Sequence, residues 1–199
     1  MKLPDPFAYP TKPHVRRHGP QGYSEYRHYR NWLRDEFSFR CVYCLRRETW
    51  FAMPRDHELD HFLPKSEHPD VERDYDNLVI ACRQCNGTKA AKCLPSPEVV
   101  AYGDCMRVDD KGRIHAKNDF GEAIIAALRL DNVRYTQLRR DVIAIIRENA
   151  PGSTAWRRFL GYPEDLPDLS KERKPKSNKC PNGVHASHFA RKHELPEYY

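Results

Sequence analysis

Apolar residues recur at intervals of three and four in several parts of the chain, the spacing that places them on one face of a helix. The first such stripe predicts a helix over residues 24–37, with Ser24 as its cap. Between the cysteines at 41 and 85 the chain is polar and interrupted by prolines. This pattern predicts two short strands, at about 58–62 and 78–81, followed by a short helix that starts near Asn86.

Further along, the same helical spacing predicts one helix around residues 124–128 and another around 135–145, separated near Asp131 and Asn132. A short helix containing Trp156 and Phe159 is expected next. The sequence thus indicates the α+β class, with an irregular proline-rich basic arm at 1–22, a catalytic module at 23–95, a helical extension at 96–162 and a poorly ordered basic tail at 163–199.

Composition narrows the choice of partners but does not identify one. Hydrophobic residues make up 39% of the 199 residues and charged residues 31%, so we expect a modest core that needs a metal or covalent staple. The net charge of +6 favours a polyanionic partner without distinguishing DNA, RNA or an acidic membrane. The apolar runs are too short to cross a bilayer and the first residues do not resemble a secretory signal, which predicts a cytoplasmic protein.

Cysteine spacing predicts a metal site. The chain has seven cysteines, an odd number that argues against a framework of disulfides. Cys41 and Cys44 form one C-x-x-C pair and Cys82 and Cys85 another, and four thiolates so arranged can close a tetrahedral structural site for Zn²⁺. Redox use of either pair is the rival interpretation. The other three cysteines are expected to be ordinary thiols, a second site with Cys180, His185 and His188 being the alternative.

Between and after these pairs stand the stretches Glu58-Leu-Asp-His-Phe-Leu-Pro-Lys-Ser66, Asp76-Asn-Leu78 and Asn86-Gly-Thr-Lys89. From Cys41 to about Lys92 the chain resembles the HNH endonucleases. The resemblance implies a ββα-metal fold in which His61 is the general base, Asn77 braces the intervening loop, and Asp60 and Asn86 bind a divalent cation. Asparagine replaces the last histidine of the signature, and oxygen ligands of this kind suit Mg²⁺ or Mn²⁺.

The spacing suggests further roles for charged residues near this motif. Lys89 lies three residues after Asn86 on the same helical face and is a candidate for binding a substrate phosphate, with Lys65 as a weaker one. Glu58 shares a strand face with Asp60 and is either an additional metal ligand or a solvent-facing residue. Because neighbouring strand residues point to opposite faces, we expect strand pairing to end or bulge after His61.

These features predict a metal-dependent endonuclease that hydrolyses phosphodiester bonds, most readily of DNA. The alternative from another class is a non-catalytic, zinc-stabilised nucleic-acid-binding module. Short patterns outside the motif, including Gly121-Glu122 and Leu138-Arg-Arg140, also resemble HNH proteins of bacterial antiphage systems. Some of those act with an ATPase, so this looser resemblance implies a protein partner of that kind and no membrane association.

Overall fold

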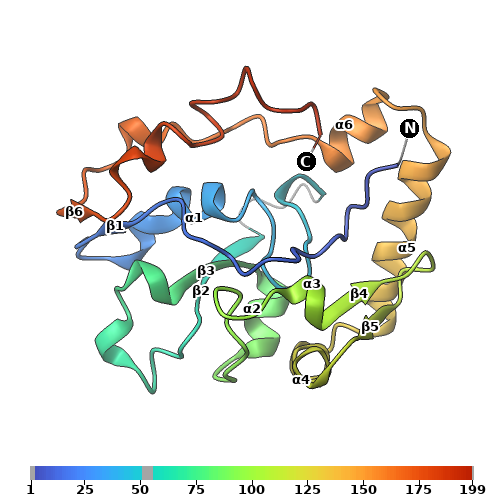
Figure 1. Cartoon of the computed structure of the whole chain (residues 1–199), viewed down its shortest axis with the longest axis horizontal. Helices are drawn as coiled ribbons and strands as arrows, with labels where there is room; N and C mark the ends of the chain where they lie inside the picture. Colours follow the sequence, from blue (N-terminus) through green and yellow to red (C-terminus); the bar gives the residue numbers. More distant parts are fainter. Residues whose placement is uncertain (1–2, 51–55, 199) are drawn as a thin grey trace. The chain divides into compact units, whose positions relative to one another are not determined.

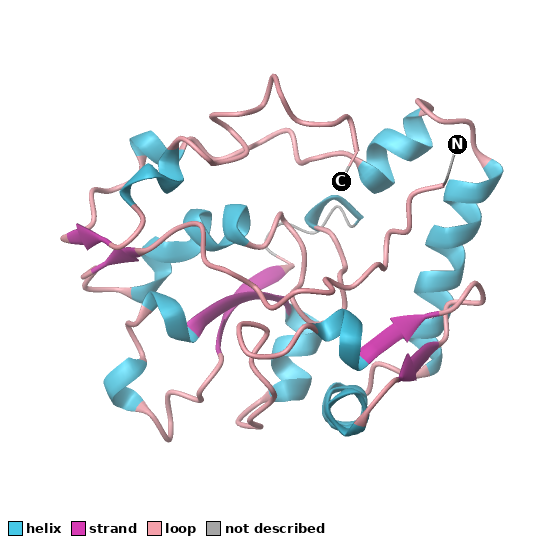
Figure 2. Cartoon of the chain, viewed as in Figure 1, coloured by secondary structure: helices cyan, strands magenta, loops and turns pink. Residues whose placement is uncertain are grey.

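The computed structural model describes residues 3–50 and 56–198, and the chain divides into two compact units. One unit contains Met1–Val15 and Leu94–Gly161, and the other contains Arg16–Cys93 and Tyr162–Tyr199. Both combine helices with two-stranded antiparallel sheets, which confirms the predicted α+β class (Figures 1 and 2). The unit that contains the cysteine pairs holds the candidate site.

The centre of that unit is a β-hairpin followed directly by a helix. Strand β2 (His57–His61) pairs with β3 (Leu78–Cys82), and α2 (Arg83–Lys89) packs against both strands (Figure 1). All five residues of β3 are buried, because its sequence is apolar on both faces. Both predicted strands are confirmed to within one residue. The helix starts three residues before Asn86, because the Cys82 Sγ accepts a hydrogen bond from the Cys85 N–H and caps it.

The predicted first helix is divided into a 3₁₀ turn, η1 (Tyr26–Tyr29), and an α-helix, α1 (Arg30–Glu36). The residue before the turn is Glu25, which makes no side-chain cap, so the expected capping by Ser24 is wrong. The apolar stripe packs on β3 as the spacing requires. The buried core cluster of this unit comprises Tyr23, Tyr29, Trp32, Leu33, Tyr75, Leu78 and Leu169.

The contacts group residues 162–199 differently from the predicted boundaries. This segment contains η5 (Leu169–Lys171), β6 (Ser177–Asn178) and η6 (Pro181–Val184), and β6 pairs with β1 (Pro20–Gln21). Residues 16–22 of the expected arm and the expected tail therefore belong to the same unit as the cysteine pairs, whereas residues 1–15 belong to the other unit. The composition of the arm and the tail gives no sign of this, because the pairing joins segments more than 150 residues apart in the chain.

A buried carboxylate holds these two segments against α1. Asp35 accepts hydrogen bonds from the His18 Nε2 at 2.7 Å and from the His188 Nδ1 at 3.0 Å. Burial alone would raise the pKa of Asp35, but the two histidines and Arg17 outweigh it and lower that pKa well below its ordinary value. The carboxylate is therefore charged at neutral pH and ties the N-terminal and C-terminal segments of the unit to one helix.

The other unit is mainly helical. It contains α3 (Tyr102–Cys105), the hairpin of β4 (Met106–Val108) and β5 (Ile114–Ala116), α4 (Asp119–Leu128), α5 (Val133–Glu148) and α6 (Thr154–Leu160). Side chains of Asn118, Asn132 and Ser153 cap the last three helices. These helices confirm the periodicity, whereas the hairpin was not predicted. No helix among the described residues is long and apolar enough to cross a membrane.

Candidate functional site

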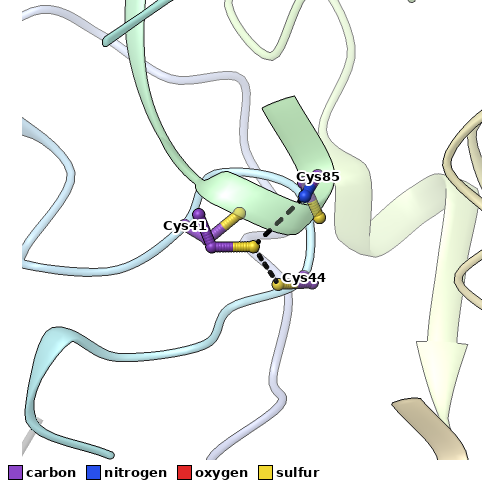
Figure 3. A group of neighbouring side chains, drawn as sticks. Cys41, Cys44 and Cys85 are labelled. Carbon is purple, nitrogen blue, oxygen red and sulfur yellow. Dashed lines mark hydrogen bonds between the residues drawn. The ribbon is translucent and has the colours of Figure 1, made fainter. Parts of the chain in front are cut away.

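Four buried thiols converge where the turn after Cys41 meets α2. Figure 3 labels three of these cysteines, Cys41, Cys44 and Cys85. The sulfur atoms of Cys41, Cys44, Cys82 and Cys85 all lie within 4.8 Å of one another, and those of Cys44 and Cys82 are 3.7 Å apart. A tetrahedral zinc that holds each sulfur at about 2.3 Å would place the sulfurs about 3.8 Å apart. None of the four forms a disulfide. The cluster therefore has the spacing and chemistry to hold zinc with four protein ligands.

Local backbone geometry brings these thiols together. Leu45 has a positive φ of 60°, which turns the chain so that its N–H donates to the Cys41 carbonyl oxygen at 3.0 Å. Hydrogen bonds from the thiols of Cys41, Cys44 and Cys85 lower the pKa of Cys82. Hydrogen bonds within the cluster and burial raise the pKa values of Cys44 and Cys85, so the thiolate, the form that binds metal, is favoured at Cys82. The cluster is the one group of three or more cysteine, histidine or acidic side chains with this proximity in the described part of the chain.

Asp60 lies on β2 and is only 4% exposed. Its Oδ2 accepts a hydrogen bond from the Tyr43 hydroxyl at 2.6 Å, and its Oδ1 accepts one from the Lys89 Nζ at 3.2 Å. Burial raises the pKa of Asp60 above its ordinary value, although Lys89 and Tyr43 act in the opposite direction. The carboxyl group is thus held in a fixed orientation between the cysteine turn and α2.

Lys89 has no exposed surface. Its ammonium contacts Asp60 and also donates to the His61 carbonyl oxygen at 2.8 Å. As predicted, Lys89 and Asn86 face the same way from α2. However, the Lys89 ammonium contacts the buried carboxylate of Asp60 and is not exposed to solvent. Lys89 is therefore not available to bind a substrate phosphate, the role that the sequence had suggested.

His61 is half-buried at the end of β2. Its Nε2–H donates to the Glu72 carbonyl oxygen at 3.0 Å, and its ring packs edge-on against Tyr26 with the centroids 4.7 Å apart. Burial lowers the pKa of His61 below its ordinary value of 6.5. At neutral pH the imidazole is therefore mostly uncharged, with its proton on Nε2 and a lone pair on Nδ1.

The strand is regular through this point. Asp60 pairs with Val79 and His61 with Leu78, and the Phe62 N–H continues to the Asn77 carbonyl oxygen at 2.8 Å. The pairing therefore ends after Phe62, as expected, but no bulge occurs at His61. Asp60 and His61 leave the strand from opposite faces, and α2 contacts the Asp60 side chain through Lys89.

Asn86 and Glu58 meet across the same face of β2 and α2. The Asn86 Nδ2 donates to one Glu58 carboxylate oxygen at 2.9 Å, and the Arg83 Nε donates to the other at 3.1 Å. The Asn86 Nδ2 is used by its bond to Glu58, whereas the Asn86 Oδ1 accepts no hydrogen bond from any residue in the described ranges. That oxygen is a hard donor of the kind that Mg²⁺ binds.

Asn77 connects the two ends of the loop between the strands. Its Oδ1 accepts from the Leu63 N–H at 2.8 Å, while its Nδ2 donates to the carbonyl oxygens of Leu63 at 3.1 Å and Val71 at 3.2 Å. These three bonds engage both the oxygen and the nitrogen of the side-chain amide. They hold the start of the loop, directly after His61, against its later part.

An open pocket of 350 Å³ brings Asp60, His61 and Asn86 together. Tyr26 and Lys65 also line it. The Lys65 side chain is 54% exposed, with its Nζ 3.6 Å from a Glu72 carboxylate oxygen and 5.5 Å from the centre of the Tyr26 ring. The lining of this open pocket therefore includes a carboxylate that Tyr43 and Lys89 already contact, an amide oxygen and a neutral imidazole. Oxygen donors of this kind suit a magnesium ion that keeps several waters.

Two tyrosines of this site were not singled out from the sequence. Tyr43 lies inside the first C-x-x-C pair and fixes Asp60, and its position there is the only sequence signal for this role. Tyr26 belongs to the apolar stripe of the first helix, but in the structure it is only partly buried and contacts His61. Helical periodicity identifies a packed face without showing that one of its members also borders a pocket.

Comparison with known proteins gives a local match to this region. Residues 41–92 match the model of the HNH endonuclease family. The chain is also 38% identical, over 53 residues, to the Septu protein PtuB of Bacillus thuringiensis. That alignment covers 25% of this chain and only 19% of the relative. No solved structure matches significantly.

Proposed function

We propose that the chain is a metal-dependent endonuclease that hydrolyses phosphodiester bonds, with DNA as its main substrate. The match of residues 41–92 to the HNH endonuclease family model supports this proposal. The observation that carries the proposal is the pocket that brings Asp60, His61 and Asn86 together. A basic net charge of +6 supports a polyanionic substrate.

In this proposal His61 is the general base. Because the Glu72 carbonyl oxygen can only accept, the neutral ring keeps its proton on Nε2 and presents Nδ1 to the pocket's water. Nδ1 takes a proton from that water as the water oxygen bonds to phosphorus, and the bond from phosphorus to the leaving oxygen breaks. A positioned base of this kind contributes about 10² to 10⁴ in rate. Asn77 maintains the loop that supplies the Glu72 carbonyl.

Asp60 and Asn86 would hold the divalent cation, which we propose to be Mg²⁺ or Mn²⁺. When bound, the cation stabilises negative charge on the phosphoryl group and the leaving oxygen. Tyr43 and Lys89 fix the Asp60 carboxylate before any cation arrives, and Lys65 stands at the pocket edge where it can contact a substrate phosphate. The four cysteines would bind a separate, structural zinc that supports the turn carrying Tyr43.

One observation favours the non-catalytic alternative. The ammonium of Lys89 already balances the charge of Asp60, so the fold does not require a cation at that carboxylate. A zinc-stabilised module that binds nucleic acid without cutting it would be compatible with this pair. The half-buried His61, with its lowered pKa and its Nε2 proton fixed, argues for catalysis because binding alone needs neither property.

We further propose that the chain acts in a bacterial antiphage system together with a protein partner such as an ATPase. The similarity to the Septu protein PtuB supports this, although it covers a fifth of that relative. Copurification of the tagged chain from its native host, with identification of bound proteins, tests the partner. Recovery of the chain alone under conditions that preserve complexes would contradict it.

Cleavage assays separate the nuclease from the binding module. Purified chain should cut supercoiled and linear duplex DNA when Mg²⁺ is present and should lose this activity when Mg²⁺ is omitted. Single-stranded DNA and RNA in parallel reactions determine the substrate range. Binding without cleavage of every substrate, with Mg²⁺ and with Mn²⁺, would favour the non-catalytic alternative.

A further inference from the structure

A second hollow, of 630 Å³, adjoins the candidate catalytic pocket in the same unit. The two share Tyr26, Leu59 and Asn86 as lining residues, so they lie side by side. Three arginines line the second hollow, and we call this part of the site the arginine groove: Arg27, Arg30 and Arg83.

The arginine groove has an excess of positive charge. Its three guanidinium groups face a single carboxylate in the described lining, that of Glu58, which already accepts hydrogen bonds from Arg83 and Asn86. Arg27 is exposed and makes no hydrogen bond or ion pair with the described residues. Arg83 has a side chain that is 65% exposed. Two of the arginines can therefore reach a ligand in the groove.

Arg30 is held in place by the strand that carries the site. Its Nη2 donates to the His57 carbonyl oxygen at 2.7 Å, at the start of β2. This bond fixes the direction of the Arg30 side chain in the lining of the second hollow. The arginine groove is thus joined to β2 by a direct hydrogen bond.

We propose that the arginine groove binds the sugar-phosphate backbone of the strand to be cut, on one side of the scissile phosphate. This inference rests on the proposed nuclease function and specifies how the substrate is held. A backbone carries one negative charge per nucleotide, and arginine forms paired hydrogen bonds to phosphate without reading sequence. Tyr26 lies at the junction of the two hollows, where a sugar or base adjoining the cut would contact its ring.

The N-terminal part of the arginine groove is a feature of this chain outside the matched domain. Arg27 and Arg30 precede the residues that match the HNH family model, which start at 41. They are positioned by η1 and α1, whose apolar face packs on β3. The first helical segment would therefore extend the nuclease domain by supplying substrate contacts from its polar face.

Salt dependence of binding tests the arginine groove independently of cleavage. A His61→Ala background prevents the proposed reaction, and fluorescence anisotropy in Mg²⁺-free buffer measures affinity for short duplex DNA, single-stranded DNA and RNA. Each lost phosphate contact should make the plot of log K against log salt less steep by about 0.9 for duplex and about 0.7 for single strands. We expect this change for Arg27→Ala and Arg83→Ala, and a largely preserved slope for Arg27→Lys.

Arg134→Ala is the matched control, because Arg134 is an exposed arginine at the start of α5 in the other unit. All variants should keep the zinc content and melting temperature of their parent. A reduced slope with any of the three nucleic acids supports the inference and identifies the class of strand held. Slopes for both alanine variants equal to those of the parent and of Arg134→Ala, on all three probes, would overturn it.

The two proposals fail in different ways. If the chain with His61 intact cuts nucleic acid but both alanine variants keep the parent slope, the arginine groove is refuted and the nuclease function stands. If nothing is cut but the slope still falls, the nuclease function is refuted and the groove remains a backbone-binding surface.

Discussion

Replacing Lys89 with methionine removes a buried charge while keeping a long, unbranched side chain. Lys89 has no exposed surface and Asp60 is 4% exposed, so the variant leaves a carboxylate without its cationic partner inside the protein. Breaking such a pair costs about 3–5 kcal/mol. Because Asp60 keeps the hydrogen bond from Tyr43, we expect the lower end, a loss of about 3 kcal/mol in the free energy of unfolding.

Urea unfolding of the zinc-loaded protein measures this loss of unfolding free energy. Its dependence on pH shows whether the unpaired Asp60 charge is the cause. The folded pKa of Asp60 is already raised by burial, and removal of the Lys89 charge should raise it further. A group whose folded pKa is raised destabilises the protein fully above that pKa and progressively less as pH falls toward the unfolded value of 3.8. The difference between variant and wild type should therefore shrink from pH 8 to pH 5.

A double-mutant cycle with Asp60→Asn identifies the pair directly. The double variant should lose less stability than the sum of the two single variants, because each single change leaves the other group without its partner. Lys92→Met is the control, since Lys92 is exposed on the following turn and should change stability by no more than about 0.5 kcal/mol. Additive losses in the cycle, or a Lys89→Met variant as stable as the control, would refute the argument.

Three other predictions concern the metal cluster, the base and the buried carboxylate. Cys44→Ala should lose stoichiometric zinc, measured by elemental analysis, and the cooperative unfolding of its unit; full zinc content in this variant would refute the cluster. The acid limb of the kcat/KM profile should fall below pH 6.5, because the lowered pKa keeps His61 neutral to more acidic pH; a limb above that value would contradict the assignment. Asp35→Asn should destabilise the chain by about 2–4 kcal/mol at pH 7. Because the folded pKa of Asp35 is lowered, the greater stability of the wild type should disappear as pH falls below 3.8. Acid unfolding at the same pH for both proteins, followed by circular dichroism, would argue against the role of the His18 and His188 contacts.

The sequence predicted the local elements of the site well. These local patterns depend on the chain's own neighbours, so strands 57–61 and 78–82 were predicted to within one residue, while the helices at 119–128 and 133–148 of the other unit were predicted shorter than they are. The cysteine spacing likewise predicted a cluster that the structure contains. In each case the residues that determine the structure lie close together in the sequence.

The contacts that were not predicted either join segments far apart in the sequence or involve the direction of a buried side chain. Pairing of Pro20 with Asn178 and binding of His18 and His188 to Asp35 depend on segments whose composition resembles that of disordered chain. Helical spacing also does not predict whether the Lys89 ammonium points to solvent or to the protein interior. Spacing gives the face of the helix, but whether a lysine on that face extends to solvent or turns to a buried carboxylate depends on the packing of Tyr43 and Asp60.

The central claim is that His61 activates water for phosphodiester hydrolysis in the pocket with Asp60 and Asn86. Single-turnover cleavage of duplex DNA in Mg²⁺ by wild type and His61→Ala tests it most directly, with zinc content and melting temperature measured on the same samples. We predict that the variant keeps its zinc and fold but cleaves more slowly by about 10² or more. A correctly folded His61→Ala protein that cleaves at the wild-type rate would contradict this account.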